Sequence, residues 1–124
     1  MAVGVIGLGL LGGAMYRGFK AVQDEVLGYD IDPVRSPNTL EETLGQNVVL
    51  ISLPTPVDAD GYCDLSAIHS VFDHADRLKV GGSLVLRSTV PIGTTDMLIK
   101  KHPNLKIGIS PEFLRSHTAD FDLL

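Results

Sequence analysis

The sequence has a single cysteine, no long apolar run and no cluster of basic residues, and each absence narrows what the protein can be. With Cys63 alone, no disulfide can form within the chain, which favours a reducing, cytoplasmic compartment. No stretch approaches the roughly eighteen apolar residues that a membrane-spanning helix needs. The net charge of −5 argues against nucleic acid or an anionic membrane as a partner. We therefore expect a soluble protein that binds neither.

The remaining composition is that of a globular domain. A chain of 124 residues with 44% hydrophobic residues is long enough for one domain with a buried core. Short, almost continuously apolar runs alternate with longer mixed segments, as in a parallel sheet that helices cover on both faces. The expected strands are residues 2–6, 26–29, 48–53, 83–86 and 106–109, and the expected helices are residues 10–22, 40–44, 65–78 and 94–101. The pattern predicts an α/β fold, a Rossmann-type doubly wound parallel sheet of about five strands.

A glycine motif lies between the first expected strand and the first expected helix. Residues 7–12, Gly-Leu-Gly-Leu-Leu-Gly, match G-x-G-x-x-G in the context that dinucleotide binding requires. The first glycine permits a tight turn, the second lets a diphosphate approach the backbone, and the third lets helix and strand pack closely. The alternative is a glycine-rich turn without a ligand. The acid described next favours the dinucleotide.

Asp30 ends the second expected strand, 18 residues beyond Gly12. An acid at about this place accepts hydrogen bonds from the adenosine ribose, and its charge repels the 2′-phosphate of NADP. Arg35 complicates this reading, because an arginine nearby can pair with that phosphate, although it can also lie over the adenine or reach the ribose. We predict NAD as the cofactor.

Three further strand ends carry unusual sequence, and in a parallel sheet all of them lie at the edge where ligands bind. Pro54 and Pro56 fix the backbone around Thr55 after the third strand. The fourth strand runs into RSTVPIGTT, which begins at Arg87, and the fifth runs into SPEFLR, which begins at Ser110. Together with the glycine turn, these segments predict a site at one sheet edge.

With GVIGLGLLG, Asp30, LPTP, STVPIGTT and SPEFLRSHTAD in this order, the chain resembles the N-terminal, NAD-binding domain of the UDP-glucose/GDP-mannose dehydrogenase family. That family oxidises a nucleotide sugar to its uronic acid with NAD. The resemblance implies cofactor contacts from Gly7, Gly9, Leu10, Leu11, Gly12, Asp30, Arg35, Leu53, Pro54, Thr55, Ser88 and Thr89. It implies catalytic roles for Glu112 and Thr89, and a nucleotide-sugar substrate such as UDP-glucose along Glu112, Phe113, Leu114 and Arg115.

The chain departs from the family pattern in three ways. Only 17 residues lie between Asp30 and Val48, so we expect the sheet to lack one edge strand. Ser116 and His117 stand where the family commonly has a glutamate and a glycine. The family's nucleophilic cysteine lies in a later, C-terminal domain that this sequence does not contain, and Cys63 lies in the wrong segment to replace it. We therefore expect residues 1–124 to form the NAD-binding domain alone, inactive without the missing domain.

Two other readings stay open. The chain can be a stand-alone binder of NAD or a nucleotide sugar without turnover, or a relative of the β-hydroxyacid dehydrogenases, against which STVPIGTT and SPEFLR speak. The histidines predict no metal site, since His69 and His74 do not share a helix face. We expect His102, which precedes Pro103, to be a solvated helix end.

Overall fold

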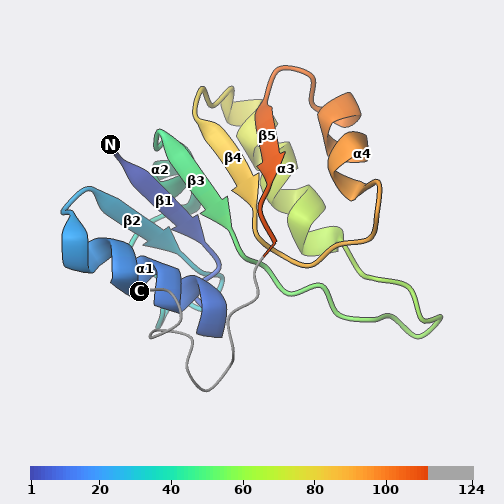
Figure 1. The fold of residues 1–124 in the computed structure, drawn as a ribbon, viewed down its shortest axis with the longest axis horizontal. Coiled ribbons are helices and arrows are strands. Elements are labelled where there is room, and N and C mark those ends of the chain that lie inside the picture. Colours follow the sequence, from blue (N-terminus) through green and yellow to red (C-terminus); the bar gives the residue numbers. More distant parts are fainter. Residues whose placement is uncertain (112–124) are drawn as a thin grey trace.

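The computed structural model describes residues 1–111, which form a five-stranded sheet with helices on both faces (Figure 1). The strands are β1 (Val3–Ile6), β2 (Val26–Tyr29), β3 (Val48–Ile51), β4 (Ser83–Leu86) and β5 (Lys106–Ile109). The helices are α1 (Leu10–Val22), α2 (Leu40–Leu44), α3 (Ser66–Leu78) and α4 (Thr94–Lys101). No helix in this part of the chain is long and apolar enough to cross a membrane.

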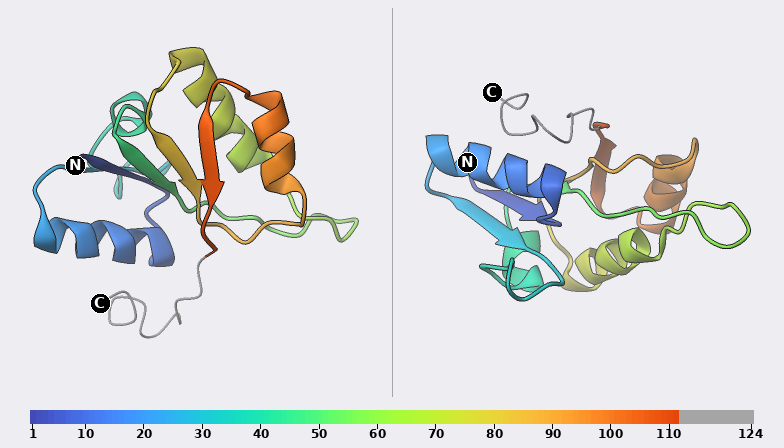
Figure 2. Two further views of the ribbon diagram at one scale, coloured as in Figure 1. Left: turned by 45° about the horizontal axis from the view of Figure 1, so that its top comes forward. Right: turned by 90° about the horizontal axis from the view of Figure 1, so that it is seen from below.

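All strand pairs are parallel, and the order is β2-β1-β3-β4-β5. The predicted Rossmann-type fold and the predicted loss of one edge strand are both confirmed. Side chains alternate along β1, so Val3 and Val5 pack with Met15 of α1 on one face. Ile6 points to the other face, where its cluster includes Leu44 of α2 and Leu98 of α4. Figure 2 shows α1 on one side of the sheet and α2 and α3 on the other.

An asparagine occupies the edge of the sheet beside β2. The backbone N–H of Gly28 donates to Asn38 Oδ1, and the Asn38 N–H donates back to the Gly28 carbonyl. Both donor–acceptor distances are 3.0 Å. These bonds satisfy groups that a neighbouring strand would otherwise take. The short link between β2 and β3 thus closes the sheet edge itself, and within residues 1–111 it contains one helix and no strand. That helix, α2, begins with a capping box, in which Thr39 and Glu42 bond to each other's backbone N–H.

The expectation for His102 was wrong. Its side chain is only 2% exposed and lies between α4 and α3, with its ring stacked on Phe72 at a centroid distance of 6.4 Å. Nδ1 is 2.6 Å from Asp76 Oδ2 of α3. The ring therefore packs the two helices together instead of facing solvent.

Candidate cofactor-binding site

A cleft of about 1420 Å³ opens at the carboxyl ends of β1, β2 and β3, the edge where parallel sheets bind ligands. From the glycine turn and the first turn of α1 it is lined by Gly7, Gly9, Leu10, Leu11 and Gly12. The segment after β2 contributes Asp30, Asp32, Arg35, Ser36 and Asn38, and the end of β3 contributes Ser52, Leu53 and Pro54. The structure thus brings together most of the residues predicted to contact the cofactor.

The three glycines of the turn have different surroundings. Gly7 has a φ of +88°, and a Cβ there would lie 2.0 Å from the Ser52 carbonyl oxygen. A Cβ on Gly12 would lie 1.6 Å from the Gly7 oxygen. Gly9 differs, because a Cβ on it would meet nothing within 4 Å. Gly7 and Gly12 are therefore required by the protein's own packing, whereas the space over Gly9 is open to a ligand.

The open space over Gly9 lies at the start of α1. Gly9 is the N-cap residue, and no side chain caps the helix. A helix N-terminus presents unpaired N–H groups and a partial positive charge, both of which favour an anion. Leu10 and Leu11 of the first turn line the cleft at this point. The arrangement fits a diphosphate.

The Asp30 carboxylate connects the glycine turn to the segment after β2. Oδ2 accepts a hydrogen bond from the Leu8 N–H at 2.7 Å, and Oδ1 accepts one from the Asp32 N–H at 2.9 Å. The Asp30 N–H donates to Ser36 Oγ at 3.0 Å. Each carboxylate oxygen can accept a further hydrogen bond, so both stay capable of receiving a ribose hydroxyl. Asp30 is thus held in place at the wall of the cleft before any ligand arrives.

Ser88 is nearly buried, with 7% of its surface exposed, and its hydroxyl is fully engaged. Ser88 Oγ accepts from the Leu53 N–H and donates to the Leu53 carbonyl, both at 2.8 Å. Nearby, Thr55 Oγ1 donates to the Thr89 carbonyl at 2.9 Å. Thr55, Ser88 and Thr89 tie the ends of β3 and β4 together and are not among the residues that line the cleft. Their predicted cofactor contacts, and the catalytic role of Thr89, stay predictions.

The predicted catalytic Glu112 and the predicted substrate residues Phe113, Leu114 and Arg115 lie outside the described residues. The described chain leads toward them along β5, where Ser110 Oγ accepts a hydrogen bond from Arg87 Nη1 at 3.1 Å. Cys63 lies in the long loop between β3 and α3, where its backbone forms an isolated antiparallel β-bridge with that of Val57. This loop extends away from the sheet (Figure 1). Its Sγ lies 3.7 Å from the Thr55 carbonyl, and the residue is not part of the cleft.

Sequence reasoning missed several residues of the cleft. Asp32, Ser36 and Asn38 follow Asp30 directly, and the short link after β2 was the available signal that this segment folds back onto the strand. A second group comes from facing sides of α2 and α3, whose approach only the tertiary structure reveals. That group is Thr39, Leu40, Glu41, Ala67, Ser70, Val71 and His74.

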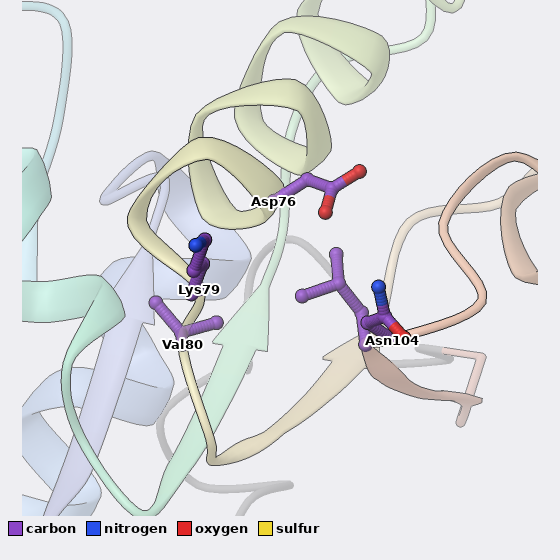
Figure 3. A pocket seen from close by; sticks show the side chains of 5 residues that line it. Asp76, Lys79, Val80 and Asn104 are labelled. Carbon is purple, nitrogen blue, oxygen red and sulfur yellow. The ribbon is translucent and has the colours of Figure 1, made fainter.

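A smaller cavity of about 370 Å³ lies between the C-terminal end of α3 and the segments that lead into β4 and β5 (Figure 3). It is lined by Asp76, Lys79, Val80, Asn104 and Leu105. Asp76 is already paired with His102, and Val80 and Leu105 belong to the packing around the core. Residues 1–111 contain no group of three or more side chains that could hold a metal ion. The cavity therefore carries no evident chemistry.

Comparison with known proteins decides the family. Residues 36–124 match the model of the UDP-glucose/GDP-mannose dehydrogenase family, NAD binding domain. The chain belongs to this family. The resemblance inferred from the motifs is confirmed, and NAD, the predicted cofactor, is the cofactor of this domain. The matched range begins after the glycine turn, so the open space over Gly9 and the position of Asp30 are independent support for a dinucleotide.

Two curated relatives are UDP-glucose 6-dehydrogenases. YwqF of Bacillus subtilis is 33% identical over 91 residues, which cover 66% of this chain and 21% of the relative. The Campylobacter jejuni enzyme is 31% identical over 88 residues, which cover 70% of this chain and 22% of the relative. The chain thus spans about a fifth of the length of these proteins.

Solved structures of nucleotide-sugar dehydrogenases share the fold. The UDP-D-ManNAc dehydrogenase of Pyrococcus horikoshii superimposes with a TM-score of 0.87 at 21% identity, over 100% of this chain and 39% of that one. GDP-mannose dehydrogenase from Pseudomonas aeruginosa gives 0.83 at 23% identity, over 99% of this chain and 38% of that one. At these identities the likeness establishes the Rossmann-type architecture.

Proposed function

We propose that this chain is the NAD-binding part of a dehydrogenase that oxidises a sugar CH–OH group of a nucleotide sugar such as UDP-glucose. The observation that carries the proposal is one cleft in which the open space over Gly9, at the start of α1, lies together with the fixed carboxylate of Asp30. A diphosphate needs the first feature and an adenosine ribose the second.

The residues that line the cleft fit the diphosphate and the adenosine ribose of the cofactor. Gly9, Leu10 and Leu11 would hold the diphosphate, and Asp30 would accept the ribose hydroxyls. Leu53 and Pro54 would form the wall on the way to the nicotinamide, with Thr55, Ser88 and Thr89 holding or contacting that end. NAD, when bound, supplies the acceptor for a hydride from the sugar carbon. This chain's own residues bind and orient it.

The nucleophile has to come from elsewhere. By the route that the family resemblance implies, oxidation of the alcohol to an acid needs a cysteine thiolate that holds the aldehyde covalently, together with groups that stabilise the oxyanion. Cys63 lies outside the cleft, with its Sγ 3.7 Å from the Thr55 carbonyl oxygen. We therefore propose that residues 1–124 form the NAD-binding domain, and that a second domain, in the same polypeptide or in a partner, completes the catalytic site beyond Glu112.

The proposal is tested by NAD binding to matched glycine variants. Gly9→Val would fill the space that the diphosphate needs, whereas Gly81→Val adds the same side chain at an exposed position with equally open surroundings, outside the cleft. We expect calorimetric titration to show NAD binding to the wild type and to Gly81→Val, and none to Gly9→Val, while all three keep the same far-ultraviolet circular dichroism. Undiminished NAD affinity in a folded Gly9→Val protein would overturn the proposal.

A further inference from the structure

The loop after β2 contains an ion pair at the wall of the cleft. Arg35 Nε lies 3.7 Å from Asp32 Oδ2, and both side chains are about half exposed, at 57% and 45%. The turn that brings them together is also bonded through its backbone, with the Arg35 N–H donating to the Asp32 carbonyl at 3.0 Å. Asp32 Oδ1 accepts from the Val34 N–H at 3.0 Å. Arg35 is thus paired with a residue of its own turn.

The place of this pair matters because NAD and NADP differ only at the ribose 2′ position. An acid at the end of the second strand favours the free 2′-hydroxyl, and a nearby arginine favours the 2′-phosphate. This chain has both residues, Asp30 and Arg35, on one wall of the cleft. Which cofactor is preferred therefore depends on whether the Arg35 guanidinium is free to meet a phosphate.

We propose that Asp32 is a specificity-determining residue, which holds Arg35 by an ion pair and so directs the cleft to NAD and against NADP. This inference rests on the proposed function. Asp32 acts in two ways: it occupies the guanidinium, and it adds a second negative charge beside Asp30. The 2′-phosphate, with its charge of about −1.5 to −2, then meets a wall with net negative charge. The other ionisable side chains lining the cleft are Tyr29 of β2, Glu41 of α2 and His74 of α3.

The strength of the effect follows from exposure. An ion pair between half-exposed groups contributes little free energy, so a single substitution of Asp32 is enough to release the Arg35 guanidinium. Asp32→Asn removes the charge but keeps Oδ1 as an acceptor for Val34, so the turn can persist. We expect NADP to bind about three- to tenfold more tightly to Asp32→Asn than to the wild type, a gain larger than any change in NAD affinity, so that the ratio of the two affinities shifts toward NADP.

The experiment is a double-mutant cycle on the 124-residue chain. NAD and NADP are titrated into the wild type, Asp32→Asn, Arg35→Ala and the double variant, at low and at physiological ionic strength. Asp24→Asn is the control, because it makes the same change of net charge at an exposed acid outside the cleft. We expect the gain in NADP affinity to be largest in Asp32→Asn and to shrink with salt. In the double variant it should fall to the smaller part that comes from the lost negative charge of Asp32.

Each result of these titrations either supports or overturns the inference about Asp32. An unchanged NADP affinity in Asp32→Asn, with NAD binding intact, would overturn the inference. A gain of equal size in the double variant, or one that Asp24→Asn reproduces, would do the same, because Arg35 would then play no part. Failure of the wild type to bind NAD at all would instead overturn the proposed function, so the two failures are distinguishable.

Discussion

The ring of His102, the residue that caps the C-terminus of α4, lies between two carboxylates of α3. Its Nδ1 is 2.6 Å from Asp76 Oδ2, and its Nε2 is 3.3 Å from Asp73 Oδ1, a distance of an ion pair without hydrogen-bond geometry. Lys101 Nζ approaches the same Asp73 oxygen at 3.2 Å. Because α3 and α4 stand side by side on the sheet, this cluster joins the middle of the chain to its last described helix.

Replacing His102 should destabilise the domain. His102→Ala removes a buried ring that stacks on Phe72 and leaves Asp76 without its partner. We expect the free energy of unfolding to fall by about 2–4 kcal/mol. Urea denaturation followed by circular dichroism measures it. The control is His74→Ala, a more exposed histidine of α3, which should cost less than about 0.5 kcal/mol. A similar loss in both variants would show that the cluster contributes nothing particular.

Acid should destabilise the protein in part through Asp73. The hydrogen bond from Lys101 lowers the pKa of the Asp73 carboxyl below its ordinary value of 3.8. A carboxyl with a lower pKa in the folded than in the unfolded state contributes stability at neutral pH, which is lost as the pH falls below about 4. Urea midpoints measured from about pH 6 to pH 2.5 should therefore fall less steeply for Asp73→Asn than for the wild type. Parallel curves would contradict this role.

An added methyl group should destabilise the domain at Gly12 but not at Gly9. Gly12→Ala places a Cβ 1.6 Å from the Gly7 oxygen, a backbone atom that cannot turn away, and we expect a loss of stability of about 3 kcal/mol or more. Gly9→Ala has open space and should unfold within about 1 kcal/mol of the wild type. Thermal denaturation of both variants compares them. Equal melting temperatures would mean that the turn relaxes around Gly12.

Ser88 should act on the cofactor through Leu53. Ser88→Ala leaves the Leu53 N–H and carbonyl without their partner, which should cost about 2 kcal/mol of stability and weaken NAD binding by loosening the cleft wall. Ser83→Ala, at an exposed serine at the start of the same strand, is the control. If Ser88→Ala lost stability but kept full NAD affinity, the hydroxyl would be structural only.

The 124-residue chain should bind NAD without oxidising a sugar. It contains Glu112 and the hydroxyls of Ser88 and Thr89, but its cysteine stands outside the cleft. We expect no absorbance at the NADH band with UDP-glucose or GDP-mannose, while a full-length relative reacts as positive control. Steady turnover that disappears in Glu112→Gln would contradict this and make the chain a minimal enzyme.

The sequence predicted the sheet well because local signals specify it. The strands at residues 26–29, 83–86 and 106–109 have the expected bounds. The first two are bordered by polar residues or glycine, and the apolar residues of the third lie between Lys106 and Ser110. The third strand was expected to reach residue 53 but ends at Ile51. The reason is that Leu53 bonds to the Ser88 side chain, a partner 35 residues away that no local pattern shows.

The part of the site that depends on local sequence was predicted, and the part that depends on tertiary packing was not. The glycine turn and Asp30 follow from spacing, and both lie at the cleft. The pairing of Asp32 with Arg35 is local too, but the role proposed for it in cofactor specificity depends on its position at the cleft, which the sequence alone does not show. The α2 and α3 lining and the burial of His102 depend on how helices pack across the sheet. Their partners lie on other elements, where periodicity gives no information.

The Asn38 bonds at Gly28 make the two edge strands of the sheet different, because in the part of the chain that the structure describes β2 is blocked to a further strand and β5 is not. At β2 the main chain is already satisfied, so another strand would have to displace an asparagine that bonds to both backbone groups of its partner. At the opposite end, β5 pairs with β4 alone among the described residues. Anything that lengthens this sheet, whether more of the same polypeptide, a second molecule or an aggregate, should therefore add at β5.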